Sequence, residues 1–314
     1  MSSTGNPLVS IGIPTYNRAN GNLLKVVERA LAQTYQNVEV IVSDNCSSDH
    51  TQELVQSIED PRVRYFRQET NIGPNNNFNF CLNQARGEYF LLFHDDDMID
   101  HDFVETCISS LEPGQSVGAI FTGVRIIDEN DSVLEEYENK GAGLSPLEFI
   151  QGWFRDTTVL YLCSTLYKTV CLKEVGGFSS KKNLYDDLVP TFTLATRYGR
   201  LDVAEVKAGF RRHSGNRGSS VPINDWIEDS LYLLDVLYRL LPDERTALST
   251  EGELYFCKKM YRNISEGLAA SHSCVDYFYV YKTYHYCYSP LHYLYKKKWD
   301  RRVEKIKKTI AIRQ

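Results

Sequence analysis

Strand-like and helix-like segments alternate over residues 8–128, and this alternation constrains the fold more than any other feature. Short apolar runs followed by turn residues predict strands, and apolar residues at helical spacing predict the helices between them. The predicted strands are residues 9–14, 38–43, 63–66, 89–93 and 118–128, and the predicted helices are residues 22–33, 49–60 and 78–85. Strands that alternate with helices in this way predict an α/β fold in which a mainly parallel sheet is covered by helices.

The helix ends in this region also carry local signals. Asp49 is followed three residues later by Gln52, and this spacing predicts a capping box at the start of the second helix. Arg86 and Gly87 follow the third helix and predict its end. These signals place each helix between two strands.

Polar residues follow three of the predicted strands at their carboxyl ends. They are Pro14-Thr15, Asp44-Asn45 and Asp95-Asp96-Asp97. Ligands of open α/β sheets bind at the carboxyl ends of the strands. We therefore expect the three polar clusters to converge on one edge of the sheet and to form the functional site.

The aspartate triplet directly follows the apolar run Tyr89–Phe93. Three carboxylates held together at the edge of a sheet repel one another unless a cation or the donors of a ligand compensate them. Mg2+ and Mn2+ are hard ions that prefer oxygen ligands, so either ion is the predicted compensator. The alternative is a solvated acidic turn that caps the next helix.

The overall composition excludes several classes of protein. A net charge of -6 over 314 residues argues against a nucleic-acid binder. The start of the chain lacks the basic and apolar regions of a signal peptide, and no apolar run approaches the roughly 18 residues that span a bilayer. The eight cysteines include no C-x-x-C pair, as expected for reduced thiols. We expect a cytoplasmic protein.

The composition changes after Pro222. Residues 223–314 contain long helical patterns, little glycine, and many tyrosines and lysines. We therefore expect a first domain of residues 1–222 and a helical C-terminal region of residues 223–314.

The end of the C-terminal region is strongly basic. Lys296 to Gln314 contain nine Lys or Arg residues and two acids, a net charge of +7; because the whole chain carries -6, residues 1–295 carry -13. Apolar residues recur at helical spacing at Trp299, Val303, Ile306 and Ile310, behind eight tyrosines in residues 277–295. This pattern predicts an amphipathic helix in peripheral contact with the inner, anionic face of a membrane. The alternatives are a helical pair packed on the first domain and a homo-oligomer contact.

Seven motifs of the first domain follow one another in an order that resembles a known family. They are VSIGIPTYNR (9–18), VIVSDNCSSD (40–49), NIG (71–73), ARGEYFLLFHDDD (85–97), GGF (176–178), YDD (185–187) and FRRH (210–213). Over residues 7–220 the ordered set resembles the family 2 inverting glycosyltransferases. The resemblance implies a GT-A fold, with a nucleotide-sugar half at residues 7–128 and an acceptor half at residues 129–222. It also implies metal-assisted transfer of a sugar, with inversion, from a nucleotide diphosphate donor to an acceptor hydroxyl during glycan or polysaccharide synthesis.

The resemblance assigns residues to the nucleotide-sugar site. It implies that Asp44 accepts the imide N–H of a uracil or thymine ring, which favours UDP or dTDP. The other residues implied to contact the donor are Pro14, Thr15, Tyr16, Arg18, Arg64, Asn71, Asp95, Asp96, Arg211 and Arg217. An Asx-turn or helix cap is the alternative role for Asp44, and a surface charge is the alternative for Arg18.

The resemblance also assigns the metal ligands. It implies that Asp97, Asp95 and His213 bind the Mn2+ or Mg2+ ion, with Asp95 also facing the ribose. The division of roles among Asp95, Asp96 and Asp97 stays open. His94 stands where some relatives have another acid, and we expect it to pack beside the ligands and not to join them.

The acid pair Asp186-Asp187 carries the expected catalytic base. It follows the Gly176–Phe178 motif at the start of a predicted helix, and the resemblance implies that Asp187 takes the proton of the acceptor hydroxyl while Asp186 orients the acceptor or shares this role. A positioned carboxylate contributes about 10^2 to 10^4 in rate. The alternative is a pair of acids that only stabilises the helix dipole.

Two other functions remain open from the sequence. A sugar-nucleotide nucleotidyltransferase shares a related sheet and an acidic metal site, but residues 13–18 lack the glycine-rich loop expected for it. A non-catalytic protein of the same fold would bind a nucleotide or a glycan without turnover. The expected partners are a nucleotide-sugar donor and a glycan or lipid-linked acceptor.

Overall fold

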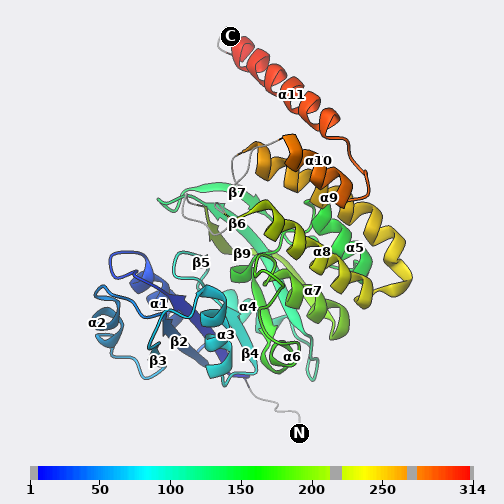
Figure 1. Ribbon diagram of the computed structural model, residues 1–314. Helices are drawn as coiled ribbons and strands as arrows, with labels where there is room; N and C mark the ends of the chain where they lie inside the picture. Colours follow the sequence, from blue (N-terminus) through cyan, green and yellow to red (C-terminus); the bar gives the residue numbers. More distant parts are fainter. Residues whose placement is uncertain (1–5, 213–220, 267–273, 312–314) are drawn as a thin grey trace. The chain divides into compact units, whose positions relative to one another are not determined.

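The computed structural model describes residues 6–212, 221–266 and 274–311. The chain divides into two compact units, residues 1–214 and 215–314, and each is described by itself (Figure 1). The domain boundary at residue 222 and the division of the first domain at residue 128 stay predictions.

The first unit is built on one mixed sheet with the strand order β3-β2-β1-β4-β8-β6-β9-β5, with β7 paired to β6. The strands are β1 Val9–Thr15, β2 Val38–Asp44, β3 Val63–Arg67, β4 Tyr89–Leu92, β5 Met98–Ile99, β6 Ala119–Ile127, β7 Val133–Tyr137, β8 Thr165–Lys168 and β9 Arg200–Arg211. β3, β2, β1 and β4 are parallel neighbours. β8 enters antiparallel between β4 and β6 and joins the two halves of the sheet.

Helices cover this sheet. They are α1 Leu23–Leu31, α2 Thr51–Gln56, α3 Pro74–Gln84, α4 Phe103–Ser109, α5 Pro146–Phe154, α6 Thr169–Glu174 and α7 Leu188–Arg197, with a 3-10 turn at Leu162–Ser164. Every residue of β1 and of β2 is buried, as expected for parallel strands that are covered on both faces. The prediction of an α/β fold is therefore confirmed.

Two local details differ from the sequence prediction. α2 begins at Thr51 and not at Asp49, and its N-cap His50 makes no side-chain cap bond. The carboxylate of Asp49 instead accepts hydrogen bonds from the backbone N–H of Ala19 and of Thr51, so the predicted capping box with Gln52 is wrong. α3 begins earlier than predicted, because Gly73 at φ 81° turns the chain and Pro74 starts the helix.

The second unit is helical. Its helices are α8 Ile223–Leu240, α9 Arg245–Ser265, α10 Cys274–Thr283 and α11 Pro290–Ala311, with a 3-10 turn at Pro242–Glu244. Tyrosines connect the last three helices. The ring of Tyr261 on α9 lies beside those of Tyr277 on α10 and Tyr293 on α11. The Tyr261 hydroxyl also donates to the carbonyl of Tyr288. None of the described helices combines the length and the apolarity that crossing a membrane requires.

Candidate active site

The carboxyl ends of β1 and β2 lie side by side at one edge of the sheet. Thr15 is in register with Asp44, and Asp44 with Arg67 at the end of β3. The hydroxyl of Thr15 donates to Oδ2 of Asp95 at 2.7 Å, so the aspartate triplet lies at the same edge. The predicted convergence of the three polar clusters is therefore what the structure shows.

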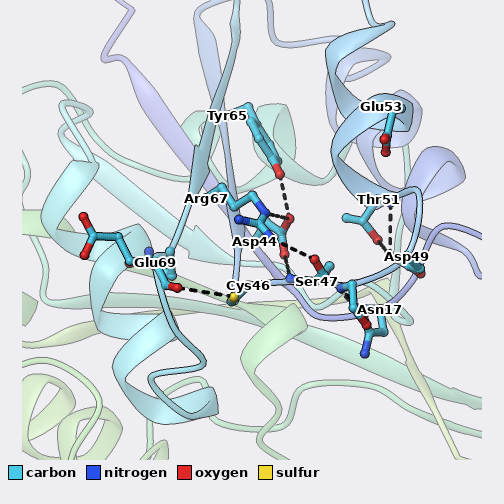
Figure 2. Close-up of polar contacts among 12 residues, drawn as sticks. Asn17, Asp44, Cys46, Ser47, Asp49, Thr51, Glu53, Tyr65, Arg67 and Glu69 are labelled. Carbon is cyan, nitrogen blue, oxygen red and sulfur yellow. Dashed lines mark hydrogen bonds and ion pairs between the residues drawn. The ribbon is translucent and has the colours of Figure 1, made fainter.

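Asp44 is fully buried and surrounded by donors (Figure 2). The hydroxyl of Tyr65 donates to its Oδ2 at 2.6 Å, the backbone N–H of Ser47 donates to its Oδ1 at 2.8 Å, and Nε of Arg67 lies 3.8 Å from Oδ2. The sequence analysis assigned no role to Tyr65 or Arg67. Alternation along β3 was the available signal, because residues two apart on a strand share one face.

Asparagine and serine side chains hold the loops around Asp44. Oδ1 of Asn17, a residue at φ 55°, accepts from the backbone N–H of Ser48, and Ser47 Oγ accepts from the N–H of Asn17. Asn71 Oδ1 accepts from the amide of Asn45 and from the N–H of Gly73. Asn71 thus positions the loop after β2, while Tyr16, just beyond β1, is 46% exposed at the same edge.

Arg64 lies nearer the middle of β3 than Arg67 does, three residues away from the strand end that pairs with Asp44. It is in register with Ile41, and its guanidinium donates to Glu39 at 2.8 Å and to the carbonyl of Gln84 at 2.9 Å. Burial alone would raise the pKa of Glu39, but hydrogen bonds from Ser10, the Arg86 backbone and Arg64 hold that pKa below its usual range. No described interaction brings Arg64 to the edge where Asp44 lies.

Asp95 faces the β1 end of the site. Besides the bond from Thr15, its Oδ1 lies 3.5 Å from Nε of Arg18, whose Nη2 is 3.9 Å from Asp96. Burial raises the pKa of Asp95 to about 6, against the opposing effects of Thr15 and Arg18. Arg18 therefore links the two acids that the sequence analysis placed beside the donor.

Asp97 faces the opposite side of the triplet and is almost completely buried. Its Oδ1 accepts from the backbone N–H of Arg211 at 3.1 Å, and its Oδ2 lies 3.5 Å from Nδ1 of His94. Burial raises the pKa of Asp97. Burial by itself would lower the pKa of His94, but its hydrogen bond to Asp97 and the charges of the triplet raise that pKa.

The acids and the imidazole form a candidate metal site. One ligand atom each of His94, Asp96 and Asp97 lies within 4.8 Å of the others. Within the described part of the chain, the buried Nε2 of His94 has no hydrogen-bond partner. Two carboxylates with an imidazole suit a divalent transition ion, so these residues fit the metal. The grouping differs from the expected one, since it includes His94 and leaves Asp95 with Thr15 and Arg18.

Arg211 supports the triplet from β9. Its Nε donates to the backbone carbonyl of Asp96 at 2.7 Å, and its other nitrogens meet the carbonyl of Asp128 and the carboxylate of Asp131. The side chain thus fixes the backbone of the acidic turn as well as lying beside it. His213 and Arg217 lie outside the described residues.

The acid pair is anchored to α3 by two asparagines. Nδ2 of Asn75 donates to Asp186 at 2.9 Å and to the carbonyl of Phe178 at 2.8 Å. Asn79, one turn later, donates to the same carbonyl and accepts from the N–H of Phe178. Gly177 has φ 71°, and a Cβ there would collide with Asn79, so this contact requires glycine.

Asp187 is the N-cap of α7, and its carboxylate accepts from the N–H of Leu188 at 2.8 Å. Asp186 is buried beside it. The structure therefore joins the acid pair to α3 through Asn75, which was not among the predicted site residues. Asn75 precedes the helix predicted at residues 78–85, so the i, i+4 pairing of Asn75 with Asn79 emerged only with the longer helix of the structure.

The mainly parallel sheet with its acidic edge is typical of proteins with the GT-A fold. The comparison with solved structures agrees with this fold. Staphylococcus aureus TarS in complex with UDP-GlcNAc superimposes with a TM-score of 0.67 at 17% identity, over 88% of this chain and 80% of that one. A mannosyltransferase from Pyrobaculum calidifontis, in complex with GDP-Man and Mn2+, superimposes with a TM-score of 0.54 at 16% identity, over 95% of this chain and 88% of that one. At these identities the likeness shows the fold.

Residues 10–175 match the sequence profile of Glycosyl transferase family 2, and the chain therefore belongs to this family of glycosyltransferase enzymes. It is 30% identical over 183 residues to an uncharacterised glycosyltransferase of Rickettsia typhi. This match covers 56% of this chain and 55% of the relative. It is 33% identical over 138 residues to a Campylobacter jejuni GalNAc(5)-diNAcBac-PP-undecaprenol β-1,3-glucosyltransferase, which covers 43% of each. The matches thus span about half of these relatives or less.

Proposed function

We propose that this protein transfers a sugar from a nucleotide diphosphate donor to an acceptor hydroxyl in glycan or polysaccharide biosynthesis, with inversion at the anomeric carbon. The observation that carries the proposal is the edge where Thr15 and Asp44 adjoin the buried acids Asp95 and Asp97. Family membership and the nucleotide sugars bound by the two structural neighbours support the class of donor.

Asp44 is the proposed reader of the nucleotide base. A carboxylate offers about four acceptor positions; the Tyr65 hydroxyl and the Ser47 N–H occupy two of them, and Nε of Arg67 lies 3.8 Å away. A remaining position would accept an imide N–H, which uracil and thymine both carry. UDP and dTDP are therefore the favoured donors, with Pro14, Thr15 and Tyr16 beside the base.

Asp96, Asp97 and His94 are the proposed holders of a divalent ion, with Asp95 and His213 as further candidate ligands. The imidazole favours Mn2+ over Mg2+. When bound, such an ion stabilises the negative charge that develops on the leaving diphosphate. Arg18 bridges Asp95 and Asp96 and is placed to meet a phosphate oxygen as well.

Asp187 is the proposed base of a single displacement. It takes the proton of the acceptor hydroxyl while the oxygen of that hydroxyl forms a bond to the anomeric carbon. The bond from that carbon to the diphosphate oxygen breaks, and the diphosphate keeps the electron pair. Asp186, which Asn75 holds in place, orients the acceptor or shares the proton transfer.

The substitution Asp187→Asn tests this proposal. We expect the turnover of UDP-sugar and dTDP-sugar donors to fall about 10^2- to 10^4-fold, because the base is lost. Thermal shifts with UDP and Mn2+ should stay at the wild-type level, since Asp187 is proposed to contact the acceptor and not the donor. Asp156→Asn, at an exposed turn, is the matched control and should keep full turnover.

Three results would contradict the proposal. Wild-type turnover in Asp187→Asn would exclude Asp187 as the base. Binding of nucleotide diphosphates by the wild type without turnover of any donor would favour a non-catalytic binding protein. Formation of a sugar nucleotide from a nucleoside triphosphate and a sugar phosphate would identify a nucleotidyltransferase.

A further inference from the structure

Helix α11 has one face that packs within its own unit. The ring of Tyr293 lies 5.3 Å from that of Tyr261, and its hydroxyl is 3.1 Å from Oγ of Ser265. Lys297, one turn further along, donates to the same Ser265 at 2.5 Å. Both side chains are half-buried, so they define the face of α11 that is held against α9.

The opposite face of α11 presents large apolar side chains to solvent. Leu291, Tyr295 and Trp299 are 78%, 69% and 56% exposed. Their four-residue spacing places them in one stripe, and a helix turns about 100° per residue, so Tyr295 lies about 200° away from Tyr293. Exposed apolar residues that gather in one patch mark a binding surface more often than scattered ones do.

Lys296 and Lys298 lie on either side of this stripe, and Arg302 follows it on the same face of the helix. Lys296, Lys298 and Arg302 are exposed, in a segment whose net charge is +7 over residues 296–314. An aromatic and aliphatic stripe edged by lysine and arginine is typical of helices that lie in a membrane interface. A symmetric pairing of two copies of α11 would instead bring their like charges together.

We propose that the Leu291, Tyr295 and Trp299 face of α11 docks on the surface of an anionic phospholipid bilayer. The aromatic rings enter the headgroup region, and Lys296, Lys298 and Arg302 meet the lipid phosphates. Tyr293 and Lys297 keep the helix attached to its own unit while its other face is on the lipid. This docking does not depend on the proposed transferase activity.

Vesicle flotation of the full chain tests the apolar stripe. We expect wild type to float with phosphatidylcholine vesicles that contain about 30 mol% phosphatidylglycerol and to stay behind with pure phosphatidylcholine. The triple variant Leu291→Ser, Tyr295→Ser, Trp299→Ser should lose flotation. The matched control, Val133→Ser, Leu134→Ser, Val170→Ser, removes three apolar side chains that are 50–61% exposed in the other unit and should float like wild type.

A second variant tests the charges without changing the stripe. Replacing Lys296, Lys298 and Arg302 with glutamine should weaken binding to the anionic vesicles about one hundredfold, since each basic residue near the surface contributes about 1 kcal/mol. Circular dichroism should show unchanged helix content in both variants. Flotation of the serine variant at the wild-type level would overturn the proposal. Light scattering that shows a wild-type dimer and a monomeric serine variant, with no flotation, would assign the stripe to a second copy instead.

Discussion

Asp44 and Asp97 are two buried carboxylates at the same edge of the sheet, and their surroundings differ in the number of donors they provide. Asp44 meets a phenol hydroxyl, a backbone N–H and a guanidinium. Asp97 meets one backbone N–H and an imidazole, beside two further acids, and burial raises its pKa. The difference teaches that the protein surrounds the Asp44 carboxylate with donors, whereas burial disfavours the charged form of Asp97, which additional positive charge would stabilise.

The pair of substitutions Asp97→Asn and Asp44→Asn should separate these two roles most strongly. We expect Asp97→Asn to lower donor turnover about 10^3-fold, because a bound metal supplies several kcal/mol of charge stabilisation and about 1.4 kcal/mol corresponds to a factor of ten. The free energy of unfolding of the metal-free protein should not fall, because a buried charge is removed. Asp44→Asn should instead lower that free energy by about 2 kcal/mol, because buried donors lose a charged acceptor.

Turnover assays with titrated Mn2+ and urea unfolding in EDTA measure both effects. Asp102→Asn is the matched control for the first substitution, because Asp102 pairs with Lys207 at the surface. If Asp97→Asn kept the wild-type dependence on Mn2+, Asp97 would not be a ligand and the contrast with Asp44 would fail.

The pH dependence of stability should differ in sign between two other buried carboxylates of the sheet. The pKa of Asp95 is raised from 3.8 to about 6, so the folded state binds more protons than the unfolded state between about pH 4 and pH 6. Its stabilising contribution is complete below this range and is lost as the pH rises through it, by about 3 kcal/mol. The pKa of Glu39 is lowered, so its contribution is present above the usual pKa of 4.5 and is lost as the pH falls through the lowered value.

Urea unfolding of Asp95→Asn and Glu39→Gln in EDTA, over pH 3 to 7.5, measures this contrast. Relative to wild type, Asp95→Asn should gain stability as the pH rises, whereas Glu39→Gln should lose stability. If the free energy of unfolding changed with pH in the same way in both variants, the pKa values of Asp95 and Glu39 would not be shifted in opposite directions.

The smallest expected effect concerns Tyr65. Tyr65→Phe removes the hydroxyl that donates to Asp44 at 2.6 Å and should lower the free energy of unfolding by about 1.5 kcal/mol, as for a hydrogen bond to a charged group. Tyr198→Phe, at a helix end, serves as the comparison. An equal loss of stability in both variants would mean that Asp44 does not depend on the Tyr65 hydroxyl.

The sequence predicted the parallel strands well because each is a short apolar run. The run 9–14 became β1 Val9–Thr15, and 38–43 became β2 Val38–Asp44. It also predicted which residues would meet at the edge, because the carboxyl ends of parallel strands share one side of a sheet. These predictions rest on local pattern alone.

Contacts between segments that are distant in the chain could not be predicted from the sequence. The antiparallel entry of β8 beside β4 depends on packing that no local pattern records. The bonds from Asn75 and Asn79 to Phe178 join residues about a hundred positions apart, and neither asparagine is distinctive by type. Arg64 was predicted to contact the donor and Arg67 was given no role, because the sequence carries no register for β3, and register decides which arginine stands beside Asp44.

The position of β8 has a consequence for how the chain folds. β1, β2 and β3 pair with strands that are close in sequence, whereas β4 must close a long loop before it pairs with β1, and β8 must close another of similar length before it pairs with β4. Contacts between distant segments form slowly because loop closure costs entropy before it is repaid. We expect the strands that carry Thr15 and Asp44 to assemble first, and the aspartate triplet and the acid pair Asp186-Asp187 to join them later, so the parts of the site would be separated in time before they are joined in space.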